Sequence, residues 1–456
     1  MSKHVHEIRD PIHGFIRLDS QERKVLDSRP FQRLRHIHQL AMTYLIYPGA
    51  THRRFEHSLG VMELAGRVFD VITNPANLDN DAARSVVTPG FDAAYWRRTV
   101  RMAALFHDTG HLPFSHAAEK ELLPEDWDHE RITDQIILGD DMKPIWKEIK
   151  VQPEDVAKLA LGPKKFGPEK HREEAFTPWE AILAEIIVGD AFGVDRMDYL
   201  LRDSYHAGVA YGRFDHFRLI DTLRILPKVG TGEPTLGIEA GGIHSAEGLL
   251  LARYFMYTQI YFHHVRRIYD YHLKEFLKEW LPDGKFPTTV ADHLLRTDNE
   301  VTTALYSAAY SSDQRGHGHA RRIFTRDHFR LLYSRNPEDV AISAGAASAV
   351  AAEAARRWGE ANVHYSQAAE KNRPLDFPVR QHGGRIASCL TVSDVLKNTP
   401  LASIEYVFIA SEHQAEAEKW LVEMRAEVIA QPPAGAENEP ETASGRVVVA
   451  DPTSPG

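Results

Sequence analysis

Cysteine is nearly absent from this chain, since Cys389 is the only one among 456 residues. A single thiol can form no internal disulfide and cannot supply the thiolate cluster of a structural zinc site. Any metal that the chain binds must therefore be held by histidine and carboxylate side chains. Glycine-rich phosphate loops are also missing, because the sequence has neither a Walker-type Gly-x-x-x-x-Gly-Lys segment nor Gly-x-Gly-x-x-Gly.

Long apolar runs are missing as well. The longest, residues 181–194, is interrupted by Glu185 and Asp190 and is too short to cross a membrane, so it predicts a buried helix. The first residues are polar and charged and lack the apolar core of a signal peptide. We therefore expect a cytoplasmic protein with no membrane partner.

Positive charge is in deficit, because 54 Lys and Arg face 64 Asp and Glu and give a net charge of -10. This balance argues against a general nucleic-acid coat, and nucleic acid is not an expected partner. A small anionic substrate is still compatible with it, because a pocket can be locally positive within an acidic protein. The 43% hydrophobic and 26% charged residues are typical of a soluble globular chain.

The apolar spacing predicts a mainly α-helical core over residues 1–335. Within it we expect a short extended segment with a turn at 10–16, a polar surface loop at 74–90, and helices at 31–40, 56–72, 92–107, 181–194, 245–280 and 290–308. A smaller α+β lobe is predicted over 336–430 from an Ala-rich helix at 337–358, strands near 363, 377–380, 385–392 and 403–409, and a helix at 412–429. The Pro- and Gly-rich end, 431–456, predicts a disordered tail.

Three separate segments carry the ligand types of a catalytic metal, namely two imidazoles and two carboxylates. They are Arg54-Phe55-Glu56-His57, His107-Asp108, and Val194-Asp195-Arg196. A lone His-Asp pair is a weak signal, because a histidine at a helix end often only caps the helix. Both members of the pair can be ligands if the backbone leaves helical geometry between them or just after, and we expect Gly110 to permit that turn.

Further histidines strengthen the signal, since imidazole serves metal, phosphate and proton chemistry. His111 and His116 follow the pair, and His129 lies in Trp127-Asp128-His129-Glu130. Solvated surface histidines are the simpler alternative for His116 and His129. Glu119 and Glu130 suit a solvated surface as well as a role beside the histidines. Arg54 and Arg196 each lie next to a ligand candidate, where a guanidinium can grip a phosphate with two hydrogen bonds.

The ordered motifs resemble the HD-domain deoxynucleoside triphosphate triphosphohydrolases, including the vertebrate enzymes with a sterile-alpha-motif domain and their shorter bacterial relatives. The resemblance covers residues 5 to 270. It is carried by Asp10-Pro11-Ile12-His13-Gly14, Phe31-Gln32-Arg33-Leu34-Arg35, Gln39-Leu40, Arg54 to Val61, His107 to His116 and Val194 to Asp203. The fold implied is a mainly α HD-domain helical core with the smaller α+β lobe as an appendage.

The resemblance also implies roles for individual residues. The metal would be bound by His57, His107, Asp108 and Asp195. The triphosphate and the proton transfers would be served by His111, His116, His129 and Glu130, with Arg54 and Arg196 holding phosphates. The sugar and base would meet Gln39, Leu40, Tyr199 and Asp203, and the far side of the site would be formed by Arg253, Tyr261 and His263.

The implied reaction is attack of water on the α-phosphorus of a dNTP, with release of the deoxynucleoside and intact triphosphate. The poor 5′-oxygen leaving group needs an acid, for which His116 is the first choice and His111 or His129 the next. A tyrosine ring under the sugar would disfavour a 2′-hydroxyl. The metal of the HD site is left open among Fe, Mn, Zn and Ni, and Mg²⁺ is expected with the triphosphate.

Regulation is where the sequence departs from the vertebrate pattern. Asp27, Gln32 and Arg35 match residues of an activator site for a guanine nucleotide, but His6 and Glu7 replace the expected basic and small apolar pair. A homotetramer or dimer is expected by analogy. Two alternatives stay open, namely hydrolysis of another nucleotide (an alarmone, a cyclic nucleotide or single-stranded nucleic-acid ends) and a nucleotide sensor without catalysis.

Overall fold

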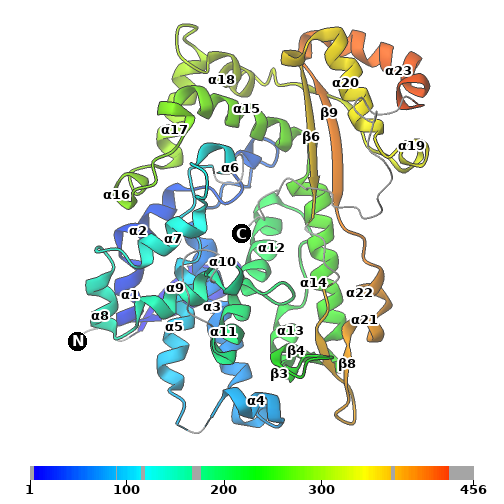
Figure 1. Cartoon of the computed structure of the whole chain (residues 1–456). Coiled ribbons are helices and arrows are strands. Elements are labelled where there is room, and N and C mark those ends of the chain that lie inside the picture. The colour runs from blue at the N-terminus through cyan, green and yellow to red at the C-terminus, as the bar shows by residue number, and fades with distance from the viewer. Residues whose placement is uncertain (1–4, 89, 115–118, 167–175, 371–374, 431–456) are drawn as a thin grey trace.

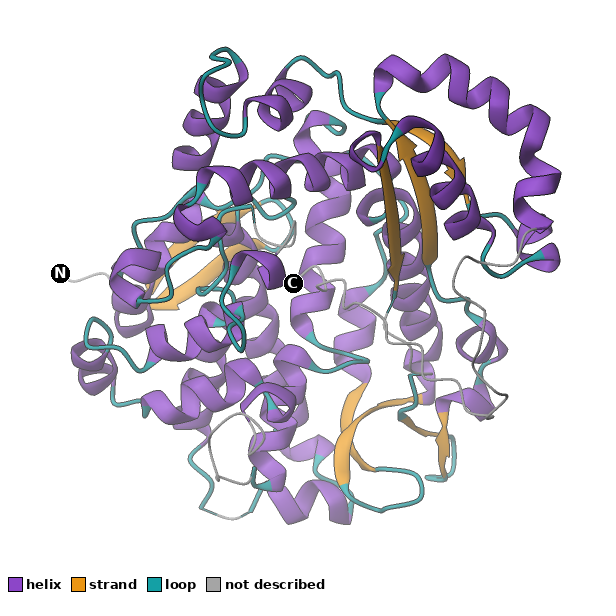
Figure 2. Cartoon of the chain, turned by 45° about the horizontal axis from the view of Figure 1, so that its top comes forward, coloured by secondary structure: helices purple, strands orange, loops and turns teal. Residues whose placement is uncertain are grey.

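Helices form most of the molecule, and three of them meet at its centre: α3 (Arg54–Ile72), α5 (Ala93–Phe106) and α12 (Val194–Ala207) (Figure 1). The computed structural model describes residues 5–88, 90–114, 119–166, 176–370 and 375–430. The strands lie in small groups apart from this centre, as Figure 2 shows. The mainly α class with a smaller α+β part is thereby confirmed, whereas the tail 431–456 lies outside the described residues.

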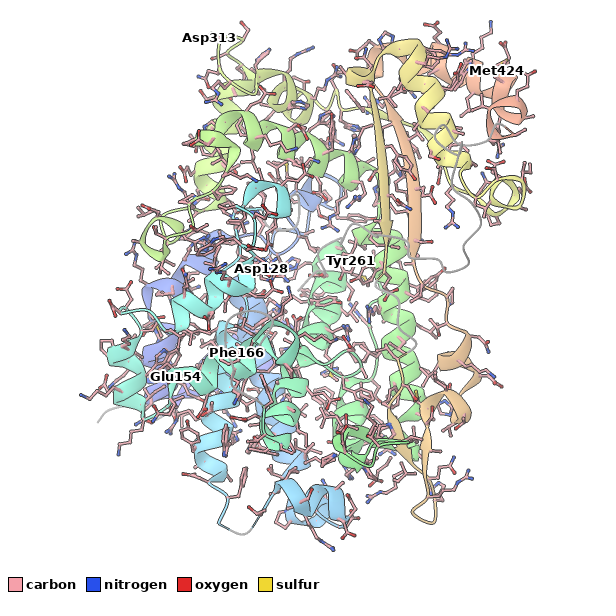
Figure 3. The ribbon with its side chains drawn as sticks, in the orientation of Figure 1. Asp128, Glu154, Phe166, Tyr261, Asp313 and Met424 are labelled. Carbon is pink, nitrogen blue, oxygen red and sulfur yellow. The ribbon has the colours of Figure 1, made fainter. Side chains whose placement is uncertain are left out.

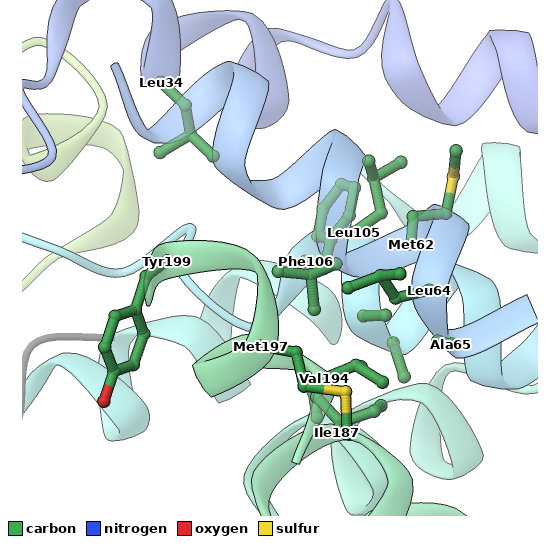
Figure 4. Packing of buried hydrophobic residues seen from close by; sticks show 14 of the residues in the cluster. Leu34, Met62, Leu64, Ala65, Leu105, Phe106, Ile187, Val194, Met197 and Tyr199 are labelled. Atoms are coloured by element: carbon green, nitrogen blue, oxygen red, sulfur yellow. The ribbon is translucent and has the colours of Figure 1, made fainter. Parts of the chain in front are cut away.

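The central helices form because their apolar faces are buried against one another. The N-terminus of α5 is fixed by Asp92, whose side chain accepts a hydrogen bond from the Tyr95 N–H at 3.0 Å. Figure 4 shows Leu64, Phe106 and Met197, one from each helix, packed into one cluster. The predicted helices at 56–72 and 92–107 are confirmed within two residues at each end.

Gly60 sets the distance between α3 and α12. A Cβ at this position would lie 1.8 Å from Oδ1 of Asp198 and 2.6 Å from Nη2 of Arg202. Only glycine therefore allows the two helices to approach so closely. The approach places Asp198 beside His57, which lies one turn earlier on α3.

The predicted helix at 31–40 is wrong beyond its first turn. α2 (Arg29–Arg33) is followed by a short 3₁₀ turn at Leu34–His36, and the chain then runs extended and bridges His38 to Arg53. The apolar residues with helical spacing are all buried, but they reach the core from different local structures. As a result Gln39 and Leu40 lie in a loop.

Other predicted helices are interrupted. The span 245–280 is divided by a π-helix (Tyr257–Tyr261) between α14 (Ile243–Met256) and α15 (His264–Trp280). Further corrected helices are α4 (Asp81–Val86) inside the expected loop, α11 (Pro178–Val188), which ends before Gly189, the pair α16 (Val290–His293) and α17 (Asp298–Ala309), and the pair α19 (Pro337–Ile342) and α20 (Ala346–Trp358). The strand predicted at 385–392 is confirmed only in its first half, β8 (Ile386–Ser388), because the next four residues form the helix α21 (Cys389–Val392).

Shorter helices cover this core. They are α1 (Ser20–Leu26), α6 (Glu119–Leu122), α7 (His129–Ile137), α8 (Lys143–Ile149), α9 (Pro153–Leu161), α10 (Pro163–Phe166), α13 (His216–Thr222), α18 (His317–Phe324), α21 (Cys389–Val392) and α22 (Asp394–Asn398). The helix α23 (Gln414–Ala430) matches the one predicted at 412–429. Within the described part of the chain, no helix is both long and apolar enough to cross a membrane.

The strands form a hairpin and two small sheets. β1 (Val5–Asp10) and β2 (Gly14–Asp19) are antiparallel, and Gly14 with φ +76° makes their turn, as the sequence predicts near 10–16. One sheet has the order β3 (Leu223–Pro227), β4 (Pro234–Glu239), β7 (Pro378–Arg380), β8 (Ile386–Ser388). The other has the order β5 (Arg330–Ser334), β9 (Ser403–Ile409), β6 (Val363–Ala369).

The expected division of the chain between 335 and 336 stays a prediction. β5 precedes that point and pairs with β9, while β7 follows it and pairs with β4. A division there would separate strands that share a sheet. The second apolar cluster, between α20, α23 and the β5-β9-β6 sheet, is nevertheless separate from the central one.

Candidate functional site

Four ligand candidates from three elements meet at the centre of the molecule. His57 comes from the first turn of α3, Asp195 is the second residue of α12, and His107 and Asp108 follow the last residue of α5. His57 Nε2 lies 3.0 Å and His107 Nε2 lies 3.4 Å from Oδ1 of Asp195, and His107 Nε2 lies 3.2 Å from Oδ1 of Asp108. Ligand atoms of His57, His107 and Asp108 all lie within 4.8 Å of one another.

These atoms fit a divalent cation. Two ligands that each lie about 2.1 Å from a metal, at right angles to each other, are roughly 3.0 Å apart. The Nε2 atoms of His57 and His107 and Oδ1 of Asp195 are buried and make no hydrogen bond of acceptable geometry with the residues that the structure describes. Buried polar atoms rarely lack a partner, so three of them aimed at one point are best explained by a cation.

Hydrogen bonds on the far side of each ring orient the two histidines. Nδ1 of His57 lies 2.8 Å from Oδ2 of Asp198, and Nδ1 of His107 lies 2.8 Å from the Ala104 carbonyl oxygen. Each ring therefore donates through Nδ1 and presents the lone pair of Nε2 to the site. Burial alone lowers the pKa of His57, but Asp195 and Asp198 outweigh burial and raise that pKa to about 10. A cation would compete with this proton.

Asp198 joins a buried polar network that the sequence-based interpretation gave no role. Its Oδ1 lies 2.6 Å from Nε2 of His13, and its Oδ2 accepts from Nε of Arg202 at 2.8 Å. Nη1 of Arg202 reaches Oδ2 of Asp10 at 2.8 Å. The signal available in the sequence was the spacing, because a residue three positions after Asp195 on a helix faces the same way.

The histidines after the metal ligands form a second group. The rings of His111 and His129 are stacked with centroids 3.9 Å apart. Oε1 of Glu119 accepts from the His129 backbone N–H at 2.6 Å and lies 2.8 Å from Nδ1 of the same residue. Glu119 is thus a buried partner of His129 and is no solvated charge. His116 lies outside the described residues.

The two stacked rings, His111 and His129, differ in charge. Burial lowers the pKa of His129, but Glu119 and Glu130 outweigh burial and raise it to about 9. Burial, together with the cations of Arg54 and His129, lowers the pKa of His111 well below its usual value. At neutral pH one ring of the stack is therefore a cation and the other is neutral. Lys165, which the sequence did not single out, lies 2.8 Å from Oε1 of Glu130.

The two phosphate-binding candidates both lie near the metal ligands. Arg54 is fully buried, and its Nη1 donates to Oδ2 of Asp108 at 2.5 Å. Arg196 is the neighbour of Asp195, and its Nη1 donates to the carbonyl oxygens of Gly189, at 3.1 Å, and Asp190. Arg54 thus donates to a ligand candidate directly, whereas the Arg196 side chain donates to the backbone before α12.

The candidate sugar-binding residues are brought together by a carboxylate. Oδ2 of Asp203 accepts from the Tyr261 hydroxyl at 2.7 Å, and its Oδ1 lies 2.7 Å from Nε2 of His52, a residue the sequence did not single out. The rings of Tyr199 and Tyr261 lie edge to face, 6.1 Å apart. Burial raises the pKa of Tyr199, and the nearby Arg196 and Arg253 oppose that rise. Figure 3 marks Tyr261 in the middle of the molecule.

The other candidates are more scattered. Gln39 and Leu40 are buried, and within the described part of the chain Oε1 of Gln39 has no hydrogen-bond partner, as expected of a group that meets a ligand. Arg253 lies near Tyr199 but pairs with Glu370, at 2.5 Å between Nε and Oε1. His263 caps α15 through its Nδ1, which accepts from the Val265 N–H at 3.2 Å.

The three activator-site candidates lie close together in the chain: Asp27 directly follows α1, Gln32 is in α2, and Arg35 is in the 3₁₀ turn after it. Asp27 pairs with Arg23 of α1, at 2.7 Å. Oε1 of Gln32 accepts from Nε of Arg35 at 2.8 Å, and the Arg35 guanidinium lies over the Phe55 ring at 3.5 Å from its centroid. Each of these candidates therefore already has a local partner.

The turn after Asp108 has a different cause from the one expected. Gly110 does not have a positive φ. A Cβ there would instead lie 2.1 Å from the His129 carbonyl oxygen and 2.5 Å from the Thr133 backbone nitrogen, so glycine is needed for the close approach of α7. The positive φ of this loop, +49°, belongs to Phe114.

Two protein-family models match this chain. The HD domain matches residues 54–203, which contain all four ligand candidates, and the HD associated region matches residues 214–364. A crystal structure of a hypothetical protein from Aquifex aeolicus has a TM-score of 0.73 with this chain at 30% sequence identity. The match covers 91% of this chain and 100% of that chain.

Two curated relatives illustrate the range of similarity. The uncharacterized protein YwfO of Bacillus subtilis is 34% identical over 262 residues, covering 57% of this chain and 52% of that protein. Human deoxynucleoside triphosphate triphosphohydrolase SAMHD1 is 32% identical over 239 residues, covering 48% of this chain and 36% of the human protein. The chain thus spans about half the length, or less, of the curated relatives it matches. It belongs to the HD-domain family of metal-dependent phosphohydrolases, with an HD-associated region after the HD domain.

Proposed function

We propose that this chain is a dNTP triphosphohydrolase, which converts a dNTP and water to a deoxynucleoside and inorganic triphosphate. One observation carries the proposal. Asp195, which lies against His57 and His107 in the metal cluster, is on α12 together with Tyr199 and Asp203, and Asp203 is bonded to Tyr261. A single helix thus connects a phosphate-directed metal site to buried aromatic and carboxylate groups of the kind that bind a sugar.

The four ligand candidates would hold a divalent metal, whose bound form supplies Lewis-acid activation of water and neutralises phosphoryl charge. Phosphate binding and proton transfer would be carried out by side chains of this protein. Arg54, which donates to Asp108, and Arg196, which is next to Asp195 in the chain, would bind phosphate oxygens beside that cluster. His129, kept cationic by Glu119 and Glu130, stabilises charge on the triphosphate or gives a proton to the 5′-oxygen. His116 is still the first candidate for the acid that protonates the 5′-oxygen. The proposal also includes Mg²⁺ bound with the triphosphate.

Preference for deoxyribose would come from the tyrosines. Tyr199 and Tyr261 are both buried. The Tyr261 hydroxyl donates to Asp203, and the Tyr199 ring packs edge to face against the Tyr261 ring. A ring fixed under C2′ leaves neither room nor a partner for a 2′-hydroxyl. His52 strengthens this arrangement, because it occupies the second oxygen of Asp203.

An activator nucleotide at Asp27, Gln32 and Arg35, and assembly into a homotetramer or dimer, are further proposals that rest on the family resemblance. Turnover assays and multi-angle light scattering, each with and without GTP or dGTP, test the activator and the assembly respectively. Faster turnover and a larger mass with guanine nucleotide are expected. Equal activity and mass under both conditions would remove the activator from the proposal.

The decisive experiment is product analysis with purified protein. Each dNTP, each NTP, a guanosine alarmone and a cyclic nucleotide are incubated with Mn²⁺ or Mg²⁺, and the products are separated by ion-exchange chromatography. Deoxynucleoside plus triphosphate from dNTPs, with little product from NTPs, is the expected result. Monophosphate plus pyrophosphate, or turnover only of the alarmone or cyclic nucleotide, would overturn the proposal.

A further inference from the structure

The connection between α16 and α17, in the HD-associated region, contacts two loops of the candidate site. We propose that Asp298, the first residue of α17, is a positioning residue that ties the loop of Gln39 and Leu40 to the loop that carries His111. This inference rests on the proposed function, because it assigns those loops to nucleotide and phosphate.

The carboxylate of Asp298 accepts three hydrogen bonds. Its Oδ2 lies 2.7 Å from the backbone nitrogen and 2.6 Å from Nδ1 of His38, the residue before Gln39. Its Oδ1 accepts from the Phe114 backbone N–H at 2.8 Å. Asp298 is 1% exposed, so water cannot take over these bonds when the carboxylate is lost.

Aromatic stacking holds the same two loops together. The His38 ring lies between Tyr44, with centroids 5.2 Å apart, and Phe114, with centroids 5.6 Å apart. The planes differ by only 21° and 11°. Phe114 has φ +49°, a backbone conformation that costs a non-glycine residue free energy and persists only where its surroundings hold it. Asp298 and His38 are the groups that hold it.

Arg33 provides a second tie to the same connection. Its Nε donates to the Arg296 carbonyl oxygen at 2.8 Å, and its Nη2 donates to the His111 carbonyl oxygen at 3.0 Å. Burial lowers the pKa of Arg33 to about 9, and Asp298 opposes that shift. The α16–α17 connection is therefore tied to the His111 loop at two points, to His111 through Arg33 of α2 and to Phe114 through Asp298.

These contacts give the Asp298 carboxylate, which belongs to the associated region, a role in positioning two loops of the HD site. Gln39 directly follows His38, and His111 lies three residues before Phe114. Reacting groups that are misplaced by about 1 Å lose roughly a hundredfold in rate, so two anchored loops preserve their relative position. Among the described residues, the Asp298 side chain makes hydrogen bonds with His38 and Phe114 and with none of the proposed ligand or substrate-binding residues.

The test compares Asp298→Asn with a matched control, Asp339→Asn, in steady-state kinetics. Asp339 is also buried and accepts from Tyr333 Oη and Asn336 Nδ2, each at 2.7 Å, but it lies in the other lobe, on α19. We expect Asp298→Asn to lower kcat/KM about 10- to 100-fold, the value of one or two charge-assisted hydrogen bonds, and to raise KM as well as lower kcat. The control should stay within about twofold of the wild-type protein, as expected of a distant site.

A second variant, His38→Ala, removes the ring's bond to Asp298 and its stacking on Phe114, and it keeps the backbone N–H bond to Asp298. It should mainly raise KM, and its effect on kcat/KM should be less than additive with Asp298→Asn. Full additivity, or an Asp298→Asn loss no larger than that of Asp339→Asn, would overturn the inference. If Asp298→Asn does not fold, the inference is tested by His38→Ala alone, which should raise KM more than it lowers kcat.

The failure of this inference and the failure of the proposed function give different results. Kinetics are measured on whichever nucleotide the wild-type protein hydrolyses, so a different substrate removes the dNTPase proposal and leaves the tie testable. Hydrogen–deuterium exchange of the Phe114 amide, which needs no substrate, gives an independent measurement. Faster exchange in Asp298→Asn and in His38→Ala is expected, and unchanged exchange in both would refute the tie.

Discussion

The substitution Gly60→Ala tests whether the α3–α12 crossing sets the metal site. The new Cβ would lie 1.8 Å from Oδ1 of Asp198, where ordinary contacts begin at 3.4 Å, so α12 or the Asp198 side chain must move. Overpacking costs about 1 to 3 kcal/mol. A strained hydrogen bond between Asp198 and His57 costs about 1.5 to 3 kcal/mol more, while alanine in a helix returns up to about 1 kcal/mol.

The net expectation is a loss of about 2 to 5 kcal/mol in the free energy of unfolding, measured by urea denaturation monitored by circular dichroism. Metal affinity should also fall about 10- to 100-fold, because Asp198 orients His57. Gly318→Ala on α18 is the control, since its Cβ would meet nothing within 4 Å and should leave both quantities nearly unchanged. If Gly60→Ala retains wild-type stability and metal content, helix spacing does not control the site.

The other predictions concern the chemistry. Asp108→Ala should abolish metal-dependent turnover and lower the bound metal measured by mass spectrometry; unchanged turnover would remove Asp108 from the ligand set. Because Glu119 and Glu130 outweigh burial and raise the pKa of His129 to about 9, activity that needs the imidazolium should fall as pH rises through about 9. Glu119→Gln should move that limb of the kcat/KM profile to lower pH, and an unmoved limb would assign it to another group. Tyr199→Ala should raise turnover of NTPs relative to dNTPs about tenfold in competition assays, and an unchanged ratio would exclude the ring from sugar selection.

The sequence could predict the ligand cluster because each ligand lies in a short segment with its own signature. His57, His107, Asp108 and Asp195 are recognisable one segment at a time, and the structure brings them together. The partner of His57 was harder to predict, since its hydrogen bond joins residues 141 positions apart in the chain. Spacing places Asp198 on the same face of the helix as Asp195, but only the crossing at Gly60 shows which ring it contacts.

Two errors have physical causes that local sequence does not contain. Helical spacing of apolar residues suggested a helix through Leu40, but the His38 N–H bonds to Asp298, 260 residues away, and the chain leaves the helix. Gly110 was expected to supply a turn, yet its role is to admit the His129 carbonyl. In both cases a contact between distant segments overrides the local preference.

The metal-ligand candidates and the residues that contact the candidate sugar-binding groups lie in two different regions of the chain. All four ligand candidates lie within residues 54–203, whereas Tyr261 and Asp298 lie within 214–364. The HD domain match contains the metal-ligand and phosphate-binding candidates, but within it Asp203 lacks its Tyr261 partner, and the Gln39 loop, which precedes the match, is bonded to Asp298 of the associated region. We therefore expect substrate selectivity to follow changes in the associated region, because Tyr261 and Asp298 contact candidate sugar- and base-binding segments and are not among the four ligand candidates.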